Sequence, residues 1–231
     1  MTRVLVSGAT GRLGAPICAA VAAADDLVLA GRVARSLGGG DGFPDLAAAI
    51  ADTRAEVVID VTRPDAAEAH CLTAIAAGVP LVLGTTGMAV EGAARVDAAA
   101  RAAGVPVLSC PNFAITAVLM MRFAVEAARV LPDAAIVEEH HVAKVDAPSG
   151  TAKRTADLIE AAAGARPPIS SLRLPGVVAN QSVVFGAPAQ TLEIRNVTTS
   201  VEAFVPGALL AARRVGGLAG GLHVGLELVL D

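Results

Sequence analysis

Short runs of valine, leucine and isoleucine alternate with alanine-rich segments of helical period along the first half of the chain. These patterns predict strands at 3–8, 27–33, 56–62, 80–87 and 105–112, and helices at 15–24, 64–78 and 90–104. Because strands that alternate with helices form βαβ units, this half predicts a parallel sheet. Right-handed crossovers then make it a Rossmann-type, doubly wound α/β domain.

The pattern changes after residue 113. A helix at 117–131, a strand at 134–142 and a helix following Ser149 precede two strand-like runs, 172–186 and 189–199, that no helix separates. Adjacent strands of this kind predict a smaller α+β unit with an antiparallel or mixed sheet and helices on one face. A helix at 206–215 and a strand at 221–230 are expected to return to the first domain. We therefore predict one domain from 1–113 and 206–231, and a second from 114–205.

Composition narrows the class of protein. Of the 231 residues, 54% are hydrophobic and 17% are charged, so the chain can bury a large core. No apolar run reaches the ~18 residues of a membrane span, and the first residues form a strand, so we expect a cytoplasmic protein with no membrane partner. A net charge of −4 and the absence of Tyr and Trp argue against a nucleic-acid partner.

The cysteines and histidines show no metal-ligand spacing. Cys18, Cys71 and Cys110 are scattered, and no third ligand is spaced to help the histidine pair at 140–141. We therefore expect buried free thiols and no metal site.

A glycine-rich loop joins the first strand to the first helix. In GATGRLG, Gly8, Gly11 and Gly14 have the spacing of a variant dinucleotide fingerprint. Glycine permits the tight turn and the close approach of a pyrophosphate, which the N–H groups of the helix start would hold. The alternative is merely a tight turn between strand and helix.

The end of the second strand bears on which dinucleotide binds. An acidic residue there usually holds the ribose of NAD, whereas this chain has Arg32 and Arg35, with Arg12 in the glycine loop. Since guanidinium groups match a 2′-phosphate, we expect NADPH as cofactor, with NADH also possible. The alternative is that these arginines are solvated surface residues, and Asp41 farther along complicates the interpretation.

Two further loops follow predicted strands at their carboxyl ends, GTTG at 84–87 and SCPNF at 109–113. Ligands of open parallel sheets bind at that edge, so both loops are candidate walls of a nicotinamide site. Either could instead be an ordinary turn.

The stretch EEHHVAKVDAPSGTA, residues 138–152, gathers the titratable groups of the second domain. His140 and His141 are expected in a strand, on opposite faces, with Lys144 in the turn that follows. A histidine there could move a proton, and the lysine supplies a positive charge. The alternative is a solvated histidine pair at the edge of a sheet.

The same stretch predicts the start of a helix. Ser149 is expected to cap it, which would leave the N–H groups of Gly150 and Thr151 for an anion. Together with Lys144, such a helix start would bind a carboxylate.

This long motif resembles the signature of the 4-hydroxy-tetrahydrodipicolinate reductase family, historically dihydrodipicolinate reductase. VSGATGRLG, VVIDVTRPDAA, VLGTTG and CPNFAITAVLM resemble motifs of that family in the same order. The resemblance implies NAD(P)H-dependent reduction of 4-hydroxy-tetrahydrodipicolinate to tetrahydrodipicolinate, with loss of water, in lysine and diaminopimelate biosynthesis. It also implies a homotetramer assembled through the sheet of the second domain.

The resemblance further implies roles for single residues. His140 would be the acid or base, Lys144 a proton donor, and the dicarboxylate substrate would be held by His141, Ser149, Gly150 and Thr151. Cofactor contacts are expected, together with Arg35, from Gly8, Thr10, Gly11, Arg12, Leu13, Gly14, Gly84, Thr85, Thr86, Cys110, Pro111, Asn112 and Phe113.

The second half of the substrate domain departs from the family pattern. Only PPISS separates Arg166 from the next predicted strand, and Asn180, Asn196 and Val201 stand where relatives often carry histidine or arginine. The alternatives are therefore a paralogous reductase acting on another cyclic imine or unsaturated acid, or a nucleotide-binding regulator without turnover. Retention of His140 and Lys144 argues against the regulator.

Overall fold

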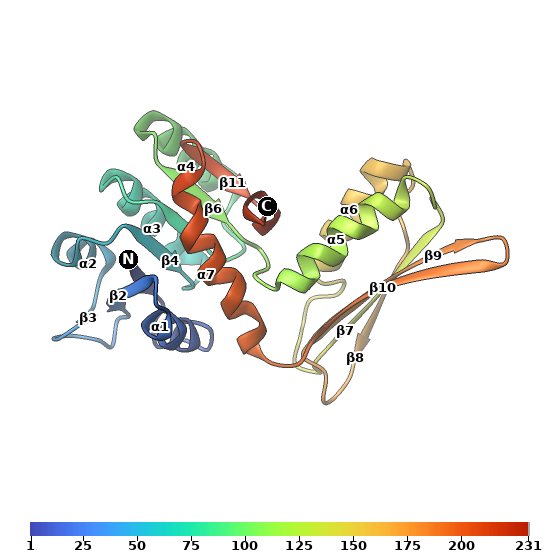
Figure 1. Ribbon diagram of the computed structural model, residues 1–231, viewed down its shortest axis with the longest axis horizontal. Coiled ribbons are helices and arrows are strands. Elements are labelled where there is room, and N and C mark those ends of the chain that lie inside the picture. Colours follow the sequence, from blue (N-terminus) through green and yellow to red (C-terminus); the bar gives the residue numbers. More distant parts are fainter. Residues whose placement is uncertain (231) are drawn as a thin grey trace. The chain divides into compact units, whose positions relative to one another are not determined.

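The computed structural model describes residues 1–230, and the chain forms two compact units. One unit comprises Met1–Phe113 and Phe204–Asp231, and the other comprises Ala114–Ala203. Each unit has its own sheet and its own helices (Figure 1). Within residues 1–230, no helix is both long and apolar enough to cross a membrane.

The first unit is built on a seven-stranded sheet in which every pairing is parallel. Its strands, in the order β11-β6-β5-β4-β1-β2-β3 across the sheet, are β1 (Thr2–Ser7), β2 (Leu27–Val33), β3 (Gly42–Phe43), β4 (Val57–Asp60), β5 (Leu81–Leu83), β6 (Pro106–Ser109) and β11 (Gly221–Val224). The central strands are buried on both faces, and Leu5, Ile59 and Leu81 are fully buried. This is the doubly wound arrangement, and the Rossmann-type prediction is confirmed.

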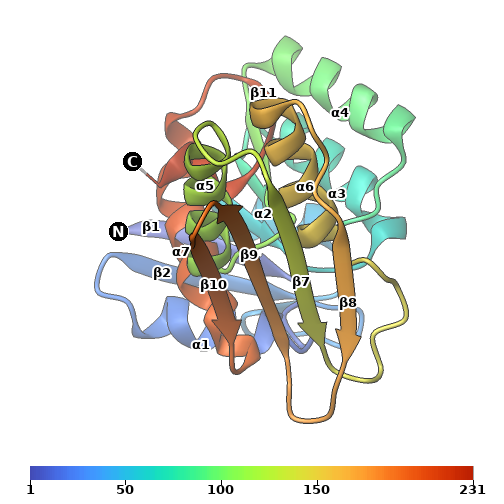
Figure 2. The same ribbon diagram turned by 90° about the vertical axis from the view of Figure 1, so that its right-hand side faces the viewer.

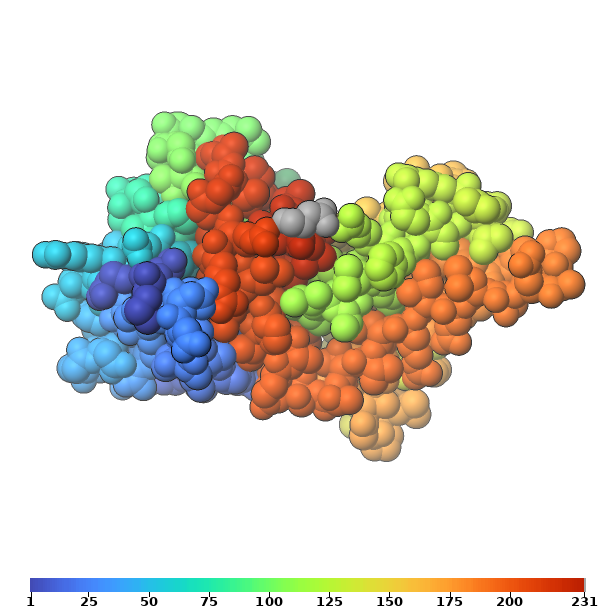
Figure 3. Space-filling model, viewed as in Figure 1, coloured from blue at the N-terminus to red at the C-terminus, as the bar shows by residue number. Residues whose placement is uncertain are grey.

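Helices cover both faces of this sheet. They are α1 (Gly14–Ala23), α2 (Leu46–Thr53), α3 (Pro64–Ala76), α4 (Val90–Ala103) and α7 (Val205–Arg214). α1 packs against α7, whereas α2, α3 and α4 pack in succession against one another. The blue atoms of the N-terminal part of the chain lie beside α7 in Figure 3, where α1 packs against it and Arg213 Nε lies 2.7 Å from Asp26 Oδ2. The C-terminal segment is therefore part of the first unit.

The second unit is a four-stranded mixed sheet with two helices. In the order β10-β9-β7-β8, its strands are β7 (Ala134–His140), β8 (Ile169–Arg173), β9 (Ala179–Ala187) and β10 (Gln190–Thr198), and its helices are α5 (Ile115–Ala128) and α6 (Gly150–Ala163). β9 is antiparallel to both neighbours, whereas β7 and β8 are parallel. This confirms the predicted α+β unit.

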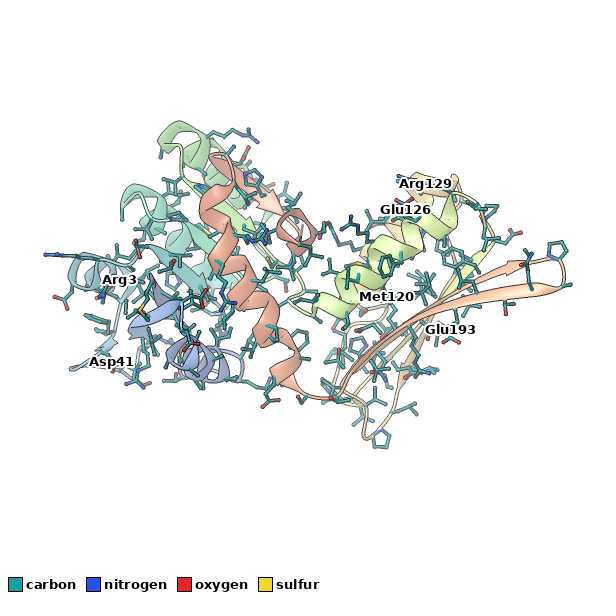
Figure 4. The ribbon with its side chains drawn as sticks, in the orientation of Figure 1. Arg3, Asp41, Met120, Glu126, Arg129 and Glu193 are labelled. Atoms are coloured by element: carbon teal, nitrogen blue, oxygen red, sulfur yellow. The ribbon has the colours of Figure 1, made fainter. Side chains whose placement is uncertain are left out.

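Both helices of the second unit lie on one face of its sheet, and the other face is uncovered in Figure 2. Met120 of α5, labelled in Figure 4, is buried between the helix and the sheet, as is Ile159 of α6. On the outer side of α5, Glu126 and Arg129 form an exposed ion pair one turn apart. The helix-covered face thus carries the core of this unit.

Some predicted strands end earlier than the sequence indicated. The run 172–186 is not one strand, because a turn at Pro175 and Gly176 (φ 79°) separates β8 from β9. The run 221–230 returns to the first unit as expected, where it pairs with β6. The strand stops at Val224, since Gly225 has φ 117° and a short 3₁₀ helix, Leu226–Val229, follows. In both places a glycine with positive φ interrupts the extended backbone.

Two elements were not predicted, and one link was misplaced. α2 begins where the Asp45 carboxylate accepts the Ala48 N–H at 2.9 Å, and the short β3 precedes it. The segment PPISS is not a link, because β8 already begins at Ile169 and pairs with β7. Only residues 164–168 connect α6 to that strand.

Candidate active site

The glycine loop between β1 and α1 is too crowded for side chains. Gly8 has φ 84°, and a Cβ at Gly14 would lie 2.0 Å from the Gly8 carbonyl oxygen. A substitution at either position would open the turn. No side chain caps α1, so the loop leaves the start of this helix for a ligand's phosphates.

A cavity of about 890 Å³ adjoins the loop within the first unit. Four of the predicted cofactor residues line it, namely Gly8, Thr10, Gly11 and Arg35. Small-molecule sites commonly enclose ~300–1,000 Å³, so part of a dinucleotide fits this space.

The arginines near this cavity differ in their partners. Arg32 is held by Asp41 through two hydrogen bonds, Nε–Oδ2 at 2.9 Å and Nη2–Oδ1 at 2.6 Å. Arg35 lines the cavity and has no hydrogen bond or ion pair within residues 1–230. Of these two arginines, Arg35 is therefore the one that a ligand in the cavity could contact.

The remaining predicted cofactor residues follow β1, β5 and β6 along the carboxyl edge of the sheet but do not line that cavity. Their exposure differs: Gly14, Thr85, Cys110 and Phe113 are buried, Leu13, Gly84 and Asn112 are half-buried, and Arg12, Thr86 and Pro111 are exposed. A Cβ at Gly84 would lie 2.4 Å from the Phe113 ring, so the two loops pack tightly. Burial also raises the pKa of the Cys110 thiol well above its usual value.

Sequence reasoning missed a contact between a buried carboxylate at the end of β4 and a half-buried histidine. Asp60 is fully buried, and its Oδ2 lies 2.5 Å from His70 Nδ1. Its Oδ1 accepts the Thr62 N–H at 3.1 Å and the Thr62 hydroxyl at 2.7 Å. His70 comes from α3 and lines the cavity beside Ser7. No local motif joins Asp60 to His70, because only the fold brings the helix back over the strand end.

In the second unit, His140 is bound to a buried carboxylate. His140 is the last residue of β7, and its Nδ1 is hydrogen-bonded to Oε2 of Glu138, which lies on the same face of the strand. Glu138 is fully buried and also meets the Arg173 guanidinium at 3.0 and 3.1 Å and the Ser149 N–H at 3.3 Å. Sequence reasoning missed the roles of both Glu138 and Arg173.

These contacts set the pKa values of the pair. Burial raises the pKa of Glu138, but the hydrogen bonds from Arg173, Ser171 and His140 outweigh it and hold that pKa below its usual value. Burial lowers the pKa of His140, and the Glu138 carboxylate opposes this change without cancelling it. Since Nδ1 faces Glu138, Nε2 is the ring atom left to exchange a proton with a ligand.

The residues after β7 form a loop and a helix start. His141 is exposed and lies outside the strand, so the prediction that His140 and His141 share one strand on opposite faces is wrong. Lys144 Nζ lies 2.8 Å from Asp146 Oδ1. The predicted cap is confirmed, because Ser149 Oγ accepts the Ala152 N–H at 3.1 Å.

Gly150 and Thr151 are the first residues of α6, so five of the predicted substrate and catalytic residues, with His141, Lys144 and Ser149, lie at one helix start and its preceding loop. Within residues 1–230, no group of three or more His, Cys, Asp or Glu side chains is placed to hold a metal ion.

The first unit thus has a dinucleotide-type fold, and the second carries a carboxylate-bound histidine and a lysine beside a helix start. This combination is typical of nicotinamide-dependent oxidoreductases of small acids. The family model for the dihydrodipicolinate reductase N-terminus matches residues 2–113, and that for the C-terminus matches residues 116–230. The chain belongs to the dihydrodipicolinate reductase family.

Individual relatives agree along the whole chain. The 4-hydroxy-tetrahydrodipicolinate reductase of Moorella thermoacetica is 41% identical and covers 99% of this chain and 98% of its own. That of Mycolicibacterium smegmatis is 43% identical, with 99% of both chains covered. The solved dipicolinate-bound dihydrodipicolinate reductase from Paenisporosarcina sp. TG-14 matches with a TM-score of 0.91 and 29% identity over 100% of both chains.

Proposed function

We propose that this protein reduces 4-hydroxy-tetrahydrodipicolinate to tetrahydrodipicolinate, with release of water, in lysine and diaminopimelate biosynthesis. The observation that carries the proposal is the Glu138-bound His140 beside Lys144 and the start of α6. It occurs in a chain that is 41–43% identical to curated 4-hydroxy-tetrahydrodipicolinate reductases along its length.

In this reaction the second unit binds the substrate and moves protons. Lys144 donates a proton and, with the helix-start residues Gly150 and Thr151, holds a substrate carboxylate. His141 and Ser149 lie beside that carboxylate. His140 exchanges a proton at Nε2 while Glu138 holds Nδ1, which fixes the tautomer. Loss of the hydroxyl as water needs such a proton source.

Lys144 must change partners for this role. Its ammonium group is paired with Asp146, whose carboxylate is largely exposed. Exposed ion pairs contribute only ~0–1 kcal/mol, so a substrate carboxylate replaces Asp146 at little cost.

The first unit holds the cofactor, which supplies the hydride when bound. The glycine loop takes the pyrophosphate, and the loops after β5 and β6 supply the remaining contacts. Arg35 favours NADPH, because its guanidinium lines the cavity without a protein partner.

We also propose a cytoplasmic homotetramer. The uncovered sheet face of the second unit supports this, because Leu172 of β8 and Val197 of β10 expose apolar side chains. Exposed apolar side chains on an uncovered sheet face are suited to packing against another copy. Light scattering coupled to gel filtration measures the assembly, and a monomeric mass would contradict this part of the proposal.

One assay tests the function. The oxidation of NADPH is followed with freshly generated 4-hydroxy-tetrahydrodipicolinate, and nucleotide binding is measured in parallel without substrate. We expect turnover that depends on both compounds. Nucleotide binding without turnover would instead indicate a non-catalytic nucleotide-binding protein.

A further inference from the structure

Arg173, near the end of β8, uses every donor of its side chain. Its hydrogen bonds run from Nε to the Lys144 carbonyl (3.2 Å), from Nη1 to Glu138 Oε2 (3.1 Å) and the Leu172 carbonyl (2.7 Å), and from Nη2 to Glu138 Oε1 (3.0 Å) and the Asp146 carbonyl (2.7 Å). A guanidinium group has five N–H donors, and here each has an acceptor.

These bonds join the two groups that the reaction needs. The bidentate contact fixes the Glu138 carboxylate, which in turn holds the His140 ring by Nδ1. The contacts to two loop carbonyls fix the backbone that carries Lys144. Arg173 is also the cross-strand partner of His140 in the parallel pairing of β8 with β7.

We propose that Arg173 is a positioning residue for the reduction, which sets the orientation of His140 through Glu138 and the placement of Lys144 through its loop. The inference rests on the proposed function of the site. Arg173 has no role as a substrate ligand in it, since all five of its donors are bound within the protein.

Lysine cannot replace this side chain. An ammonium group offers three donors around one point, so it cannot hold both carboxylate oxygens and two separate loop carbonyls. Loss of the guanidinium would also leave Glu138 buried without its main positive partner. The conservative exchange Arg173→Lys is therefore expected to impair the site.

The charges around His140 allow a test that needs no turnover. Glu138 lies against Nδ1, whereas Lys144 and Arg173 are the nearby positive groups, and Asp146 is paired with Lys144. Removing Arg173 removes a positive charge that disfavours protonation of the ring. The Glu138–His140 pair should then take up its shared proton at higher pH than in the native protein.

The experiment compares Arg173→Ala and Arg173→Lys with the native protein and with Arg166→Ala. Arg166 is a suitable control because it bridges two carboxylates of the same unit, Asp157 and Glu160, on the surface of α6. For both Arg173 variants we expect kcat to fall about 10²-fold while KM for NADPH stays within about twofold, the pattern of misplaced reacting groups. Added guanidinium ion should restore part of the activity of Arg173→Ala, and the control should keep native turnover.

Histidine ¹⁵N NMR spectra complete the test without substrate. With four histidines in the chain, His140 can be assigned by comparison with His140→Gln. Native kcat together with an unchanged Nδ1-protonated tautomer and titration of His140 in both variants would overturn the inference. If the native protein does not turn over the pathway substrate, the proposed function fails, and the spectra still decide whether Arg173 positions His140. If Arg173→Ala does not fold, Arg173→Lys decides alone.

Discussion

Asp60 Oδ2 lies 2.5 Å from His70 Nδ1 on the wall of the proposed cofactor cavity, and this pair joins strand β4 to helix α3. The second Asp60 oxygen accepts the N–H and hydroxyl of Thr62, and the Thr85 hydroxyl approaches it at 3.4 Å. Asp60→Ala would leave these partly or fully buried groups without their acceptor. We expect the free energy of unfolding to fall by ~1–3 kcal/mol, measured by urea denaturation.

Asp60→Asn should cost less than Asp60→Ala, because an amide keeps one acceptor oxygen and can pair with the other tautomer of His70. Asp52→Ala, at an exposed position on α2, is the control and should change stability little. If substitutions at positions 52 and 60 lowered the free energy of unfolding equally, the hydrogen bonds of Asp60 would make no specific contribution to stability.

Arg35→Ala should weaken NADPH binding about tenfold and leave NADH nearly unchanged. A charge-assisted phosphate contact is worth ~1.5–3 kcal/mol, and only NADPH has the 2′-phosphate. Isothermal titration with each cofactor measures the two affinities. Arg95→Ala, which removes an ion pair with Glu68 on the helices α3 and α4, is the control. Equal losses of affinity for NADPH and NADH would show that Arg35 does not bind the 2′-phosphate.

The sequence predicted those features that depend on local pattern. The alternation of apolar runs and helices is sufficient for the parallel sheet, and Ser149 lies three residues before the N–H that it caps. The termini of β8 and β11 were missed because a single glycine with positive φ ends an otherwise apolar run.

The residues that hold the candidate site in place are close together in the fold but far apart in the chain. Arg173 lies 35 residues from Glu138, and the parallel pairing of β7 with β8 alone makes them neighbours. Nothing in the sequence around Arg173 marks it, since it stands in an apolar run. Glu138 was part of a recognised motif, but its burial, which gives it its role, follows only from the packing of α6 on β7.

His140→Ala and Lys144→Ala should lower turnover ~10²–10⁴-fold and change the Kd for NADPH much less. Loss of a positioned proton donor has a cost of this size. Lys144→Ala should also raise KM for the substrate, because the ammonium group doubles as a carboxylate partner. Steady-state kinetics measures both effects, and His223→Ala, whose ring is hydrogen-bonded to the Ala219 carbonyl, is the control. Near-native turnover in both site variants would show that His140 and Lys144 have only a structural role.

The stability of the protein should fall on acidification because of His140. Its pKa in the folded protein lies below the ordinary value of 6.5, owing to burial. Below about pH 6.5 the unfolded chain therefore binds a proton that the folded chain does not, and the free energy of unfolding decreases as pH falls through the folded pKa. The contribution of His140 to the free energy of unfolding is fully present above the ordinary pKa of histidine.

Urea denaturation between about pH 7 and 5 measures this dependence, since histidine is the side chain that ordinarily titrates in that range. His140→Gln should flatten the decrease, because glutamine keeps a donor for Glu138 but binds no proton. Parallel pH profiles for the native protein and the variant would show that His140 makes no such contribution.

The side chains of Asn180 and Asn196 bear on the choice of substrate. Asn180 donates to Glu139 at 2.9 Å and accepts the Thr198 N–H at 3.1 Å, while Asn196 accepts the Thr116 hydroxyl at 2.6 Å. Both amides are thus held by contacts within the protein. Asn196 lies on the same face of the sheet as Glu138, whereas Asn180 is the cross-strand partner of Glu139 on the opposite face. We therefore expect the site-facing side of the second unit to offer a dianion less positive charge at position 196 than a histidine there would.

A dicarboxylate loses more than a monocarboxylate when positive groups become neutral, because each lost charge contact weakens binding of the second carboxylate alone. We expect the ratio of kcat/KM for 4-hydroxy-tetrahydrodipicolinate to that for a monocarboxylate cyclic imine to be about tenfold smaller than in a relative with histidine at the position of Asn196, equivalent to one contact of ~1.5 kcal/mol. Asn196→His should raise the ratio towards that of the relative. A ratio already as large as the relative's would contradict this expectation and indicate ordinary selectivity, since neighbouring subunits of a tetramer can supply the missing charge. A faster reaction with the monocarboxylate would mean that the natural substrate has changed while His140, Glu138 and Lys144 kept their chemistry.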